Sequence, residues 1–167
     1  MNAKESIKSQ YWASLEMLRQ AILQCPDSLW QSAEYQNPFW HVAYHAIFYT
    51  HLYLHATEAD FSLWQKHRAG VRSLKGPSEG NEAETAYSKE EVLEYLDFCL
   101  EQMESLVDAL NLEGQSGFYW LPFDKLELQF YNIRHIQQHT GELCERLGAK
   151  GEVQVDWVGM KEWLVTS

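Results

Sequence analysis

Hydrophobic residues recur at helical spacing in four stretches of this chain, and no stretch shows the alternation that is typical of a β-strand. The first stretch runs from about Ala3 to Gln24. It ends at Cys25-Pro26-Asp27, because proline cannot continue the hydrogen-bond ladder of a helix. The second opens at Asn37-Pro38, a capping residue followed by proline at the first helical position, and reaches about Ala56.

The two later stretches have equally clear ends. Ser88-Lys89-Glu90-Glu91 is an S-x-x-E capping box, which predicts a third helix over about Ser88–Leu110. After a turn around Gly114–Gly117, we expect a fourth helix over about Leu121–Leu147, with Gly148 as its stop signal. Four helices of this kind predict an all-α fold, a four-helix bundle that forms a single domain over residues 1–167.

A long segment, about Glu58–Tyr87, separates the second helix from the third. Its glycines and its proline predict a connector with one short helix around Phe61–His67. We interpret it mainly as a crossover between non-adjacent helices of the bundle, and a segment of this length can also cover a functional site. The tail after the fourth helix, with Trp157 and Trp163, is apolar enough to pack against the bundle.

The overall charge and the cysteines narrow the classes of function. A formal net charge of −11 over 167 residues repels phosphate backbones and argues against nucleic-acid binding. No apolar run reaches the ~18–20 residues of a membrane span, and the N-terminus has no apolar core of the signal-peptide kind. The three cysteines, Cys25, Cys99 and Cys144, show no CxxC spacing. We therefore expect a cytoplasmic protein with reduced thiols, a small-molecule substrate and neither nucleic-acid nor membrane partners.

Six of the seven histidines form three pairs spaced i, i+4, namely His41/His45, His51/His55 and His135/His139. Residues four apart lie on one face of a helix, where two imidazoles can hold one divalent metal ion. The spacing therefore indicates metal binding, and the position of each pair on its helix decides which pairs can take part.

The second helix places its two pairs on different sides. His41 and His45 share an apolar face, so either can point into the bundle. His51 lies about 120° from His45 around the helix, and His55 lies near the helix end. We therefore expect His51 and His55 at the surface or at its boundary.

The fourth helix offers a cleaner chelating pair. His135 and His139 share an inward face that also carries Glu142. A catalytic metal site commonly has three protein ligands and keeps a further position open. The second helix can supply the third ligand from His45 or from His41, and a four-histidine site would use both. The motifs HExxH, GxSxG, GxxxxGK[ST] and GxGxxG are absent.

Two segments of the chain resemble the DinB/YfiT-like superfamily. They are NPFWHVAYH with its continuation FYTHLYL in the second helix, and ELQFYNIRHIQQHTGEL in the fourth, whose HxxxHxGxL ending is the more specific. The resemblance implies a four-helix bundle with a long connection between the second and third helices, often as a homodimer. It also implies a divalent ion, nickel or zinc, bound by three histidines that correspond by position to His45, His135 and His139.

The same resemblance implies an activity. Characterised members of this superfamily use low-molecular-weight thiols, and many others are described as metal-dependent hydrolases. The expected function is therefore that of a metal-dependent hydrolase or a low-molecular-weight-thiol transferase. A metal-binding or sensing dimer without enzymatic activity is the alternative, and a plain interaction bundle without metal is a third possibility.

Further residues are candidates for this chemistry. Glu142, one turn past His139, stands where many relatives have glutamine or histidine; it could orient a ligand imidazole or act as a catalytic general base. Beside the Glu58–Tyr87 segment, the expected walls of a substrate pocket are Tyr44, Tyr49, Trp120 and Tyr131.

Overall fold

The computed structural model describes residues 2–75, 86–151 and 153–161. Within these residues, a bundle is formed by four long helices, which are α1 (Ala3–Gln24), α3 (Phe39–Tyr53), α4 (Lys89–Ala109) and α5 (Lys125–Gly151). A short helix, α2 (Asp27–Trp30), and a 3-10 turn, η1 (Glu58–Asp60), complete the helical elements of this part of the chain. The described residues contain no strand, so the prediction of an all-α helical bundle is confirmed.

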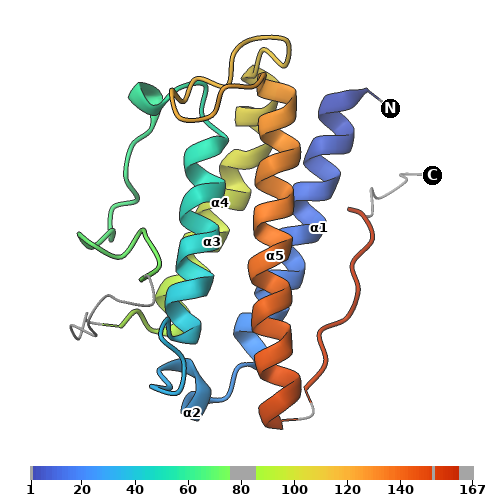
Figure 1. Ribbon diagram of the computed structural model, residues 1–167. Coiled ribbons are helices and arrows are strands. Elements are labelled where there is room, and N and C mark those ends of the chain that lie inside the picture. The colour runs from blue at the N-terminus through green and yellow to red at the C-terminus, as the bar shows by residue number, and fades with distance from the viewer. Residues whose placement is uncertain (1, 76–85, 152, 162–167) are drawn as a thin grey trace.

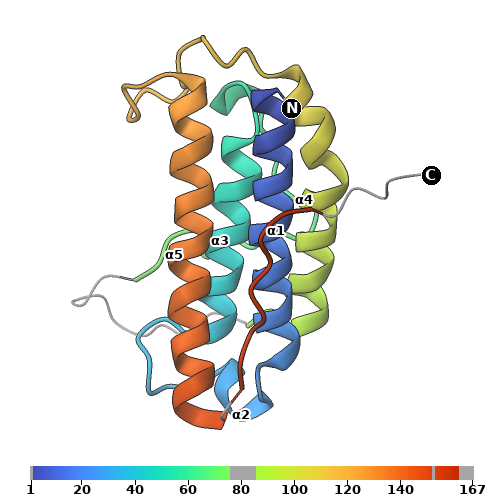
Figure 2. The ribbon, with the colours of Figure 1, turned by 90° about the vertical axis from the view of Figure 1, so that its right-hand side faces the viewer.

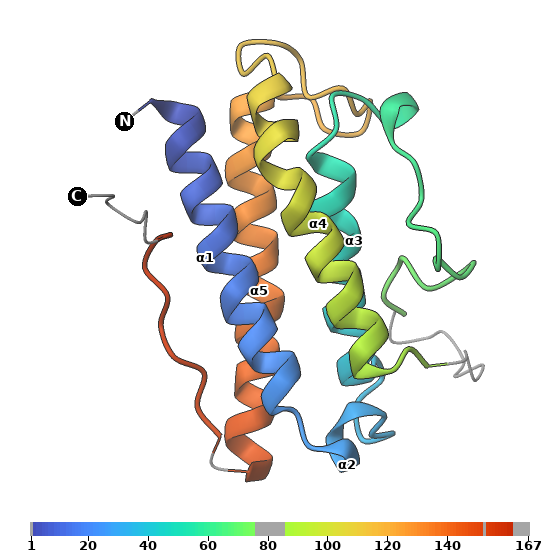
Figure 3. The same cartoon turned by 180° about the vertical axis from the view of Figure 1, so that it is seen from behind.

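The order of the helices around the bundle explains the long connection. α1 and α3 each pack against both α4 and α5, and they lie diagonally across the bundle from each other (Figure 1). α3 and α4 run in the same direction, so the chain has to return along the bundle between them (Figure 3). The connection is thus a crossover, but it joins two helices that pack together. The expectation that it joins non-adjacent helices is wrong.

The helix ends follow local hydrogen bonds. The Ser88 capping box is present, with Ser88 Oγ accepting from the Glu91 amide (3.2 Å) and Glu91 Oε2 accepting from the Ser88 amide (2.9 Å). α5 begins at Lys125 rather than at Leu121, because Asp124 caps it by accepting from the Glu127 amide (2.7 Å). It also continues past Gly148 to Gly151, so Gly148 is not its stop signal.

Three further expectations need correction. Residues 61–67 do not form the predicted short helix; the one helical turn nearby is η1, just before them. α3 ends at Tyr53, three residues short of Ala56. The described part of the tail runs along α1 (Figure 2), and its Lys161 amide donates to Ser9 Oγ (3.1 Å). Trp157, which was expected to pack, is 79% exposed, so its ring does not join the core. Trp163 lies outside the described residues.

α3 is apolar on all sides and is buried on nearly all sides. Thirteen of its 15 residues are buried, which is typical of a helix covered by more than one layer of neighbours. α4 and α5 cover two sides, and the connection covers a third, where the rings of Phe61 and His67 lie 5.6 Å and 5.4 Å from that of Phe48. The two residues of α3 that keep partial exposure are His45 and Tyr49.

His51 is buried, which contradicts its expected place at the surface. Its ring lies among Phe61, Tyr95 and Phe98, and its Nδ1 is 3.1 Å from the Tyr95 hydroxyl oxygen. His55 is half-buried and donates from Nδ1 to the His51 carbonyl (2.8 Å). The side of α3 opposite His45 faces α4 and the connection instead of solvent, and this is why the helical wheel misplaced His51.

The connection between α4 and α5 is fastened to the end of α3. The ammonium group of Lys125 donates to the carbonyls of His55 (3.1 Å) and Ala56 (2.7 Å). Gly117 has a φ of 84° and passes so close to this end that an added Cβ would lie 2.0 Å from the Ala56 carbonyl oxygen. A side chain at residue 117 therefore meets both backbone strain and a steric clash.

Gly117→Ala should destabilise the protein by about 2–4 kcal/mol, because the clash is with backbone and the chain must shift to relieve it. The matched control is Gly148→Ala on α5, where an added Cβ has no atom within 4 Å. It should raise stability by up to about 1 kcal/mol through helix propensity. Urea unfolding followed by circular dichroism measures both, and equal stabilities for the two variants would contradict the close approach.

His51 should make folding stability depend on pH. Burial, and then the neighbouring His55, lower the pKa of His51 to about 4. Below the unfolded-state pKa of about 6.5 the unfolded chain binds the proton first, so stability is lost as the pH falls toward 4. Between pH 7 and pH 4.5 this loss is about 2 kcal/mol. Urea unfolding at both pH values should show a smaller loss for His51→Gln than for the wild type, and an identical loss would contradict the assignment.

Candidate metal centre

Three histidines meet between α3 and α5. α3 contributes His45, and the neighbouring α5 contributes His135 and His139 from successive turns. One ring nitrogen from each lies within 4.8 Å of the others, and the Nε2 atoms of His45 and His135 are 3.1 Å apart. The i, i+4 pair on one helix and the single histidine on the next thus converge on a common point.

The connection fixes the protonation of His45. His45 Nδ1 is 2.8 Å from the backbone carbonyl oxygen of Arg72. A carbonyl oxygen can only accept a hydrogen bond, so Nδ1 carries the proton and Nε2 keeps its lone pair. That lone pair lies on the side of the ring that faces His135.

Glu142 fixes His139 in a similar way. His139 Nδ1 is 3.3 Å from Glu142 Oε2, while Glu142 Oε1 accepts from the guanidinium of Arg146. Arg146 is held in turn by the carbonyl of Asn37 (2.9 Å). The hydrogen bond from His139, and secondarily the charge of Arg146, hold the pKa of the Glu142 carboxyl below its ordinary value. A proton on His139 Nδ1 leaves Nε2 of that ring free to bind a metal.

His135 differs from the other two histidines. Its Nδ1 is buried and has no hydrogen-bond partner among the described residues. Burial lowers the pKa of His135 to about 3, with His139 and His45 adding to the effect, and burial lowers that of His45 to about 4. Both imidazoles are therefore neutral near pH 7, which is the form that binds metal ions.

This donor set fits a divalent transition-metal ion. Imidazole nitrogens suit zinc and nickel, and bonds of about 2.0–2.1 Å to a common ion place two such nitrogens roughly 3 Å apart. The observed 3.1 Å between His45 and His135 agrees with that spacing.

His41 does not join the group. It is buried beside Trp40, and its Nε2 is 3.0 Å from the carbonyl oxygen of Val71. The candidate ligand group found within the described ranges contains three histidines and not four. Of the two choices that the second helix offers, the structure therefore brings His45 and not His41 to the pair on α5.

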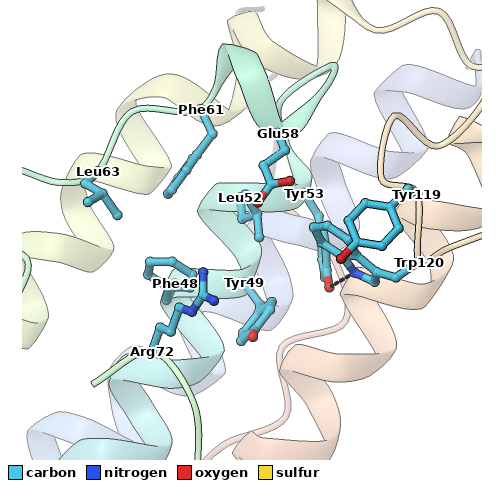
Figure 4. Close-up of a pocket in the computed structure, with 10 residues that line it drawn as sticks. All are labelled: Phe48, Tyr49, Leu52, Tyr53, Glu58, Phe61, Leu63, Arg72, Tyr119 and Trp120. Carbon is cyan, nitrogen blue, oxygen red and sulfur yellow. Dashed lines mark hydrogen bonds between the residues drawn. The ribbon is translucent and has the colours of Figure 1, made fainter. Parts of the chain in front are cut away.

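A pocket of about 530 Å³ lies on the other side of a residue that packs on the histidines. Tyr49 links the two, since its ring lies 4.8 Å from that of His45 and 5.6 Å from that of His135, centroid to centroid, and it also lines the pocket. The pocket walls are Phe48, Tyr49, Leu52, Tyr53, Glu58, Phe61, Leu63, Arg72, Tyr119 and Trp120 (Figure 4).

The expected pocket walls are only partly found there. Tyr49 and Trp120 line the pocket, whereas Tyr44 is fully buried and stacked on Tyr87. Tyr131 packs against Tyr53 and Phe123 and is not among the lining residues. Half of the eight lining residues that the sequence did not indicate come from the connection, where no hydrophobic periodicity marks them.

Of three comparisons with known proteins, one found a match. None of the described helices is both long enough and apolar enough to cross a membrane. Searches among curated proteins and among solved structures found no significant match. A profile of the DinB superfamily matches residues 10–143, a range that includes α3, α4 and the three histidines. The chain therefore belongs to the DinB superfamily.

Proposed function

We propose that this protein is a metal-dependent enzyme that carries out hydrolysis or low-molecular-weight-thiol transfer on a small molecule. The observation that carries the proposal is the convergence of His45, His135 and His139 beside an aromatic pocket. Membership of the DinB superfamily and the neutral state of two of the imidazoles support it. The proposed ion is zinc or nickel, bound by these three residues.

The ion would supply a Lewis acid that favours the deprotonated, nucleophilic form of a water or a thiol. The surrounding residues would set the geometry. The Arg72 carbonyl orients His45, and Glu142 orients His139. Tyr49 stands between the histidines and the pocket, where it can contact a substrate and exclude water.

A metal-binding or sensing dimer remains the alternative function. A buried site with four protein ligands would favour such a structural or sensing role, because no position would be left for a substrate. The group of three ligands and the adjacent pocket favour catalysis instead. The homodimer, the thiol cofactor and the cytoplasmic location stay predictions; gel filtration tests the first of them.

Protein purified without an affinity tag or added metal should contain about one zinc or nickel ion per chain. His45→Ala and His139→Ala should each lower that content at least tenfold, because two imidazoles bind a divalent ion much more weakly than three. The control is His55→Gln, a half-buried histidine outside the cluster, which should keep wild-type content. Elemental analysis measures this, and a wild type that carries no metal and takes none up would refute the proposal.

Activity assays distinguish the proposed enzyme from the alternative, a metal-sensing protein. The assays are transfer of a low-molecular-weight thiol to 1-chloro-2,4-dinitrobenzene and hydrolysis of a nitrophenyl ester. Metal-loaded wild type should accelerate one of these reactions over the uncatalysed rate, and His139→Ala should abolish the acceleration. A stoichiometric metal content together with no activity in either assay would favour the sensing role.

Glu142 is proposed to position His139 rather than to take a proton itself. Both of its carboxylate oxygens are already engaged, one by His139 and one by Arg146. Glu142→Ala should then weaken zinc binding by about 10–100-fold. Glu142→Gln retains a hydrogen-bond acceptor and should weaken it by less. Competition with a chromogenic chelator measures both affinities, and a general base would instead give variants that bind zinc normally but turn over slowly.

A further inference from the structure

The backbone at Val71 and Arg72 is anchored to α3 by two histidines. His41 Nε2 lies 3.0 Å from the Val71 carbonyl oxygen, and His45 Nδ1 lies 2.8 Å from that of Arg72. Val71 itself is almost fully buried. Arg72 therefore starts from a fixed point next to the candidate metal ligand His45, although it belongs to a connection without regular structure.

The side chain of Arg72 extends from this point into the pocket. Figure 4 shows it running along the wall formed by Phe48 and Tyr49, and all three residues line the same space. Within the described part of the chain, the guanidinium of Arg72 has no ion pair and no hydrogen bond. By contrast, the nearby Arg68 is paired with Glu91 at 2.7 Å.

An arginine in this setting is suited to bind an anion. The chain carries a net charge of −11, so a cation that is not paired with one of its many carboxylates stands out. A guanidinium offers several donors in a planar fork, which match a carboxylate or a similar anionic group. The other charged wall residue, Glu58, lies toward Leu52 and Tyr53, away from Arg72 (Figure 4).

We propose that the pocket selects small molecules that carry an anionic group on an apolar or aromatic body, and that Arg72 binds the anionic group. The aromatic rings of Phe48, Tyr49 and Phe61 would hold the apolar body. The anchoring of Arg72 beside His45 then places the bound molecule close to the three histidines. This assignment rests on the proposed function for its chemistry, but the selectivity itself depends on Arg72 and not on the metal.

The test compares 2-naphthoate with its neutral counterpart 2-naphthamide as probes, using isothermal titration calorimetry on the full-length protein as purified. Wild type should bind the naphthoate about tenfold more tightly than the amide, as expected for a charge-assisted hydrogen bond to the exposed Arg72. Arg72→Gln should bring the two affinities to within about twofold, mainly by weakening naphthoate binding. The substitution keeps the backbone carbonyl of residue 72, and hence the hydrogen bond that this carbonyl accepts from His45.

Three control variants make the outcome specific. Arg134→Gln removes an exposed arginine of α5 that lies outside this pocket and should keep the preference for the anion. Glu58→Gln should keep it as well. His139→Ala should lose metal and yet retain the preference, so a failure of the metal proposal and a failure of this one give different results.

Two outcomes would overturn the inference. One is a wild type that binds neither probe or binds both equally. The other is a preference for naphthoate that survives in Arg72→Gln, because the carboxylate would then bind the metal or another cation. Metal content, measured on the same samples, stays at its wild-type level in Arg72→Gln if the variant changes only the pocket.

Discussion

The burial of α3 is the constraint on which the rest of this structure depends. This helix is apolar around its whole circumference, so packing against α4 and α5 alone would leave one side of it in water. The connection covers that side with Phe61 and His67, which both pack on Phe48. In doing so it brings its backbone carbonyls against His41 and His45. The packing that completes the core therefore also orients a candidate metal ligand.

The two residues of α3 that stay partly exposed are those that the candidate site uses. His45 lies in the histidine group, and Tyr49 joins that group to the pocket. Burying neutral imidazoles is favourable only if their polar nitrogens find partners. Arg72 and Glu142 provide partners for His45 and His139, while His135 Nδ1 has none in the described structure. Two of the three histidines are thus oriented by hydrogen bonds to residues outside the group. Protein metal sites commonly fix the orientation of their ligands in this way.

Charge is distributed unevenly around this site. The protein is strongly acidic, yet two arginines belong to the surroundings of this site: Arg146, which is paired with Glu142, and Arg72, whose carbonyl contacts His45 and which lines the pocket. The first arginine pairs with Glu142, which contacts His139. The guanidinium of Arg72 has no ion pair or hydrogen bond among the described residues. For this reason we propose that it binds the anionic group of a substrate. Tyr49 joins the two parts of the candidate site, because its ring packs near His45 and His135 and it shares the pocket lining with Arg72.

Local sequence patterns predict most of the helical elements of the fold. The bounds of α1 and the capping box of α4 could be read from the sequence, because a proline stop and a Ser-x-x-Glu cap act within a few residues. The start of α5 was harder to predict from the sequence. Asp124 caps this helix after a turn that depends on a contact between Ser116 and Phe123, which local patterns do not show. The short helix expected at Phe61–His67 failed because tertiary packing of the connection, rather than local propensity, sets its backbone.

In the candidate site, too, some features follow from the sequence and others only from tertiary packing. The sequence by itself determined the helical bundle and the chelating spacing of His135 and His139, since both follow from the periodicity of one helix. It left His41 and His45 equivalent on one face, and it misplaced His51, because periodicity does not say what covers each face. Tertiary structure decided these points by laying an aperiodic connection over α3, which pairs His41 with the Val71 carbonyl and turns His45 toward α5. Arg72 entered the pocket in the same way, through a backbone contact that leaves no trace in the pattern of hydrophobic and polar residues.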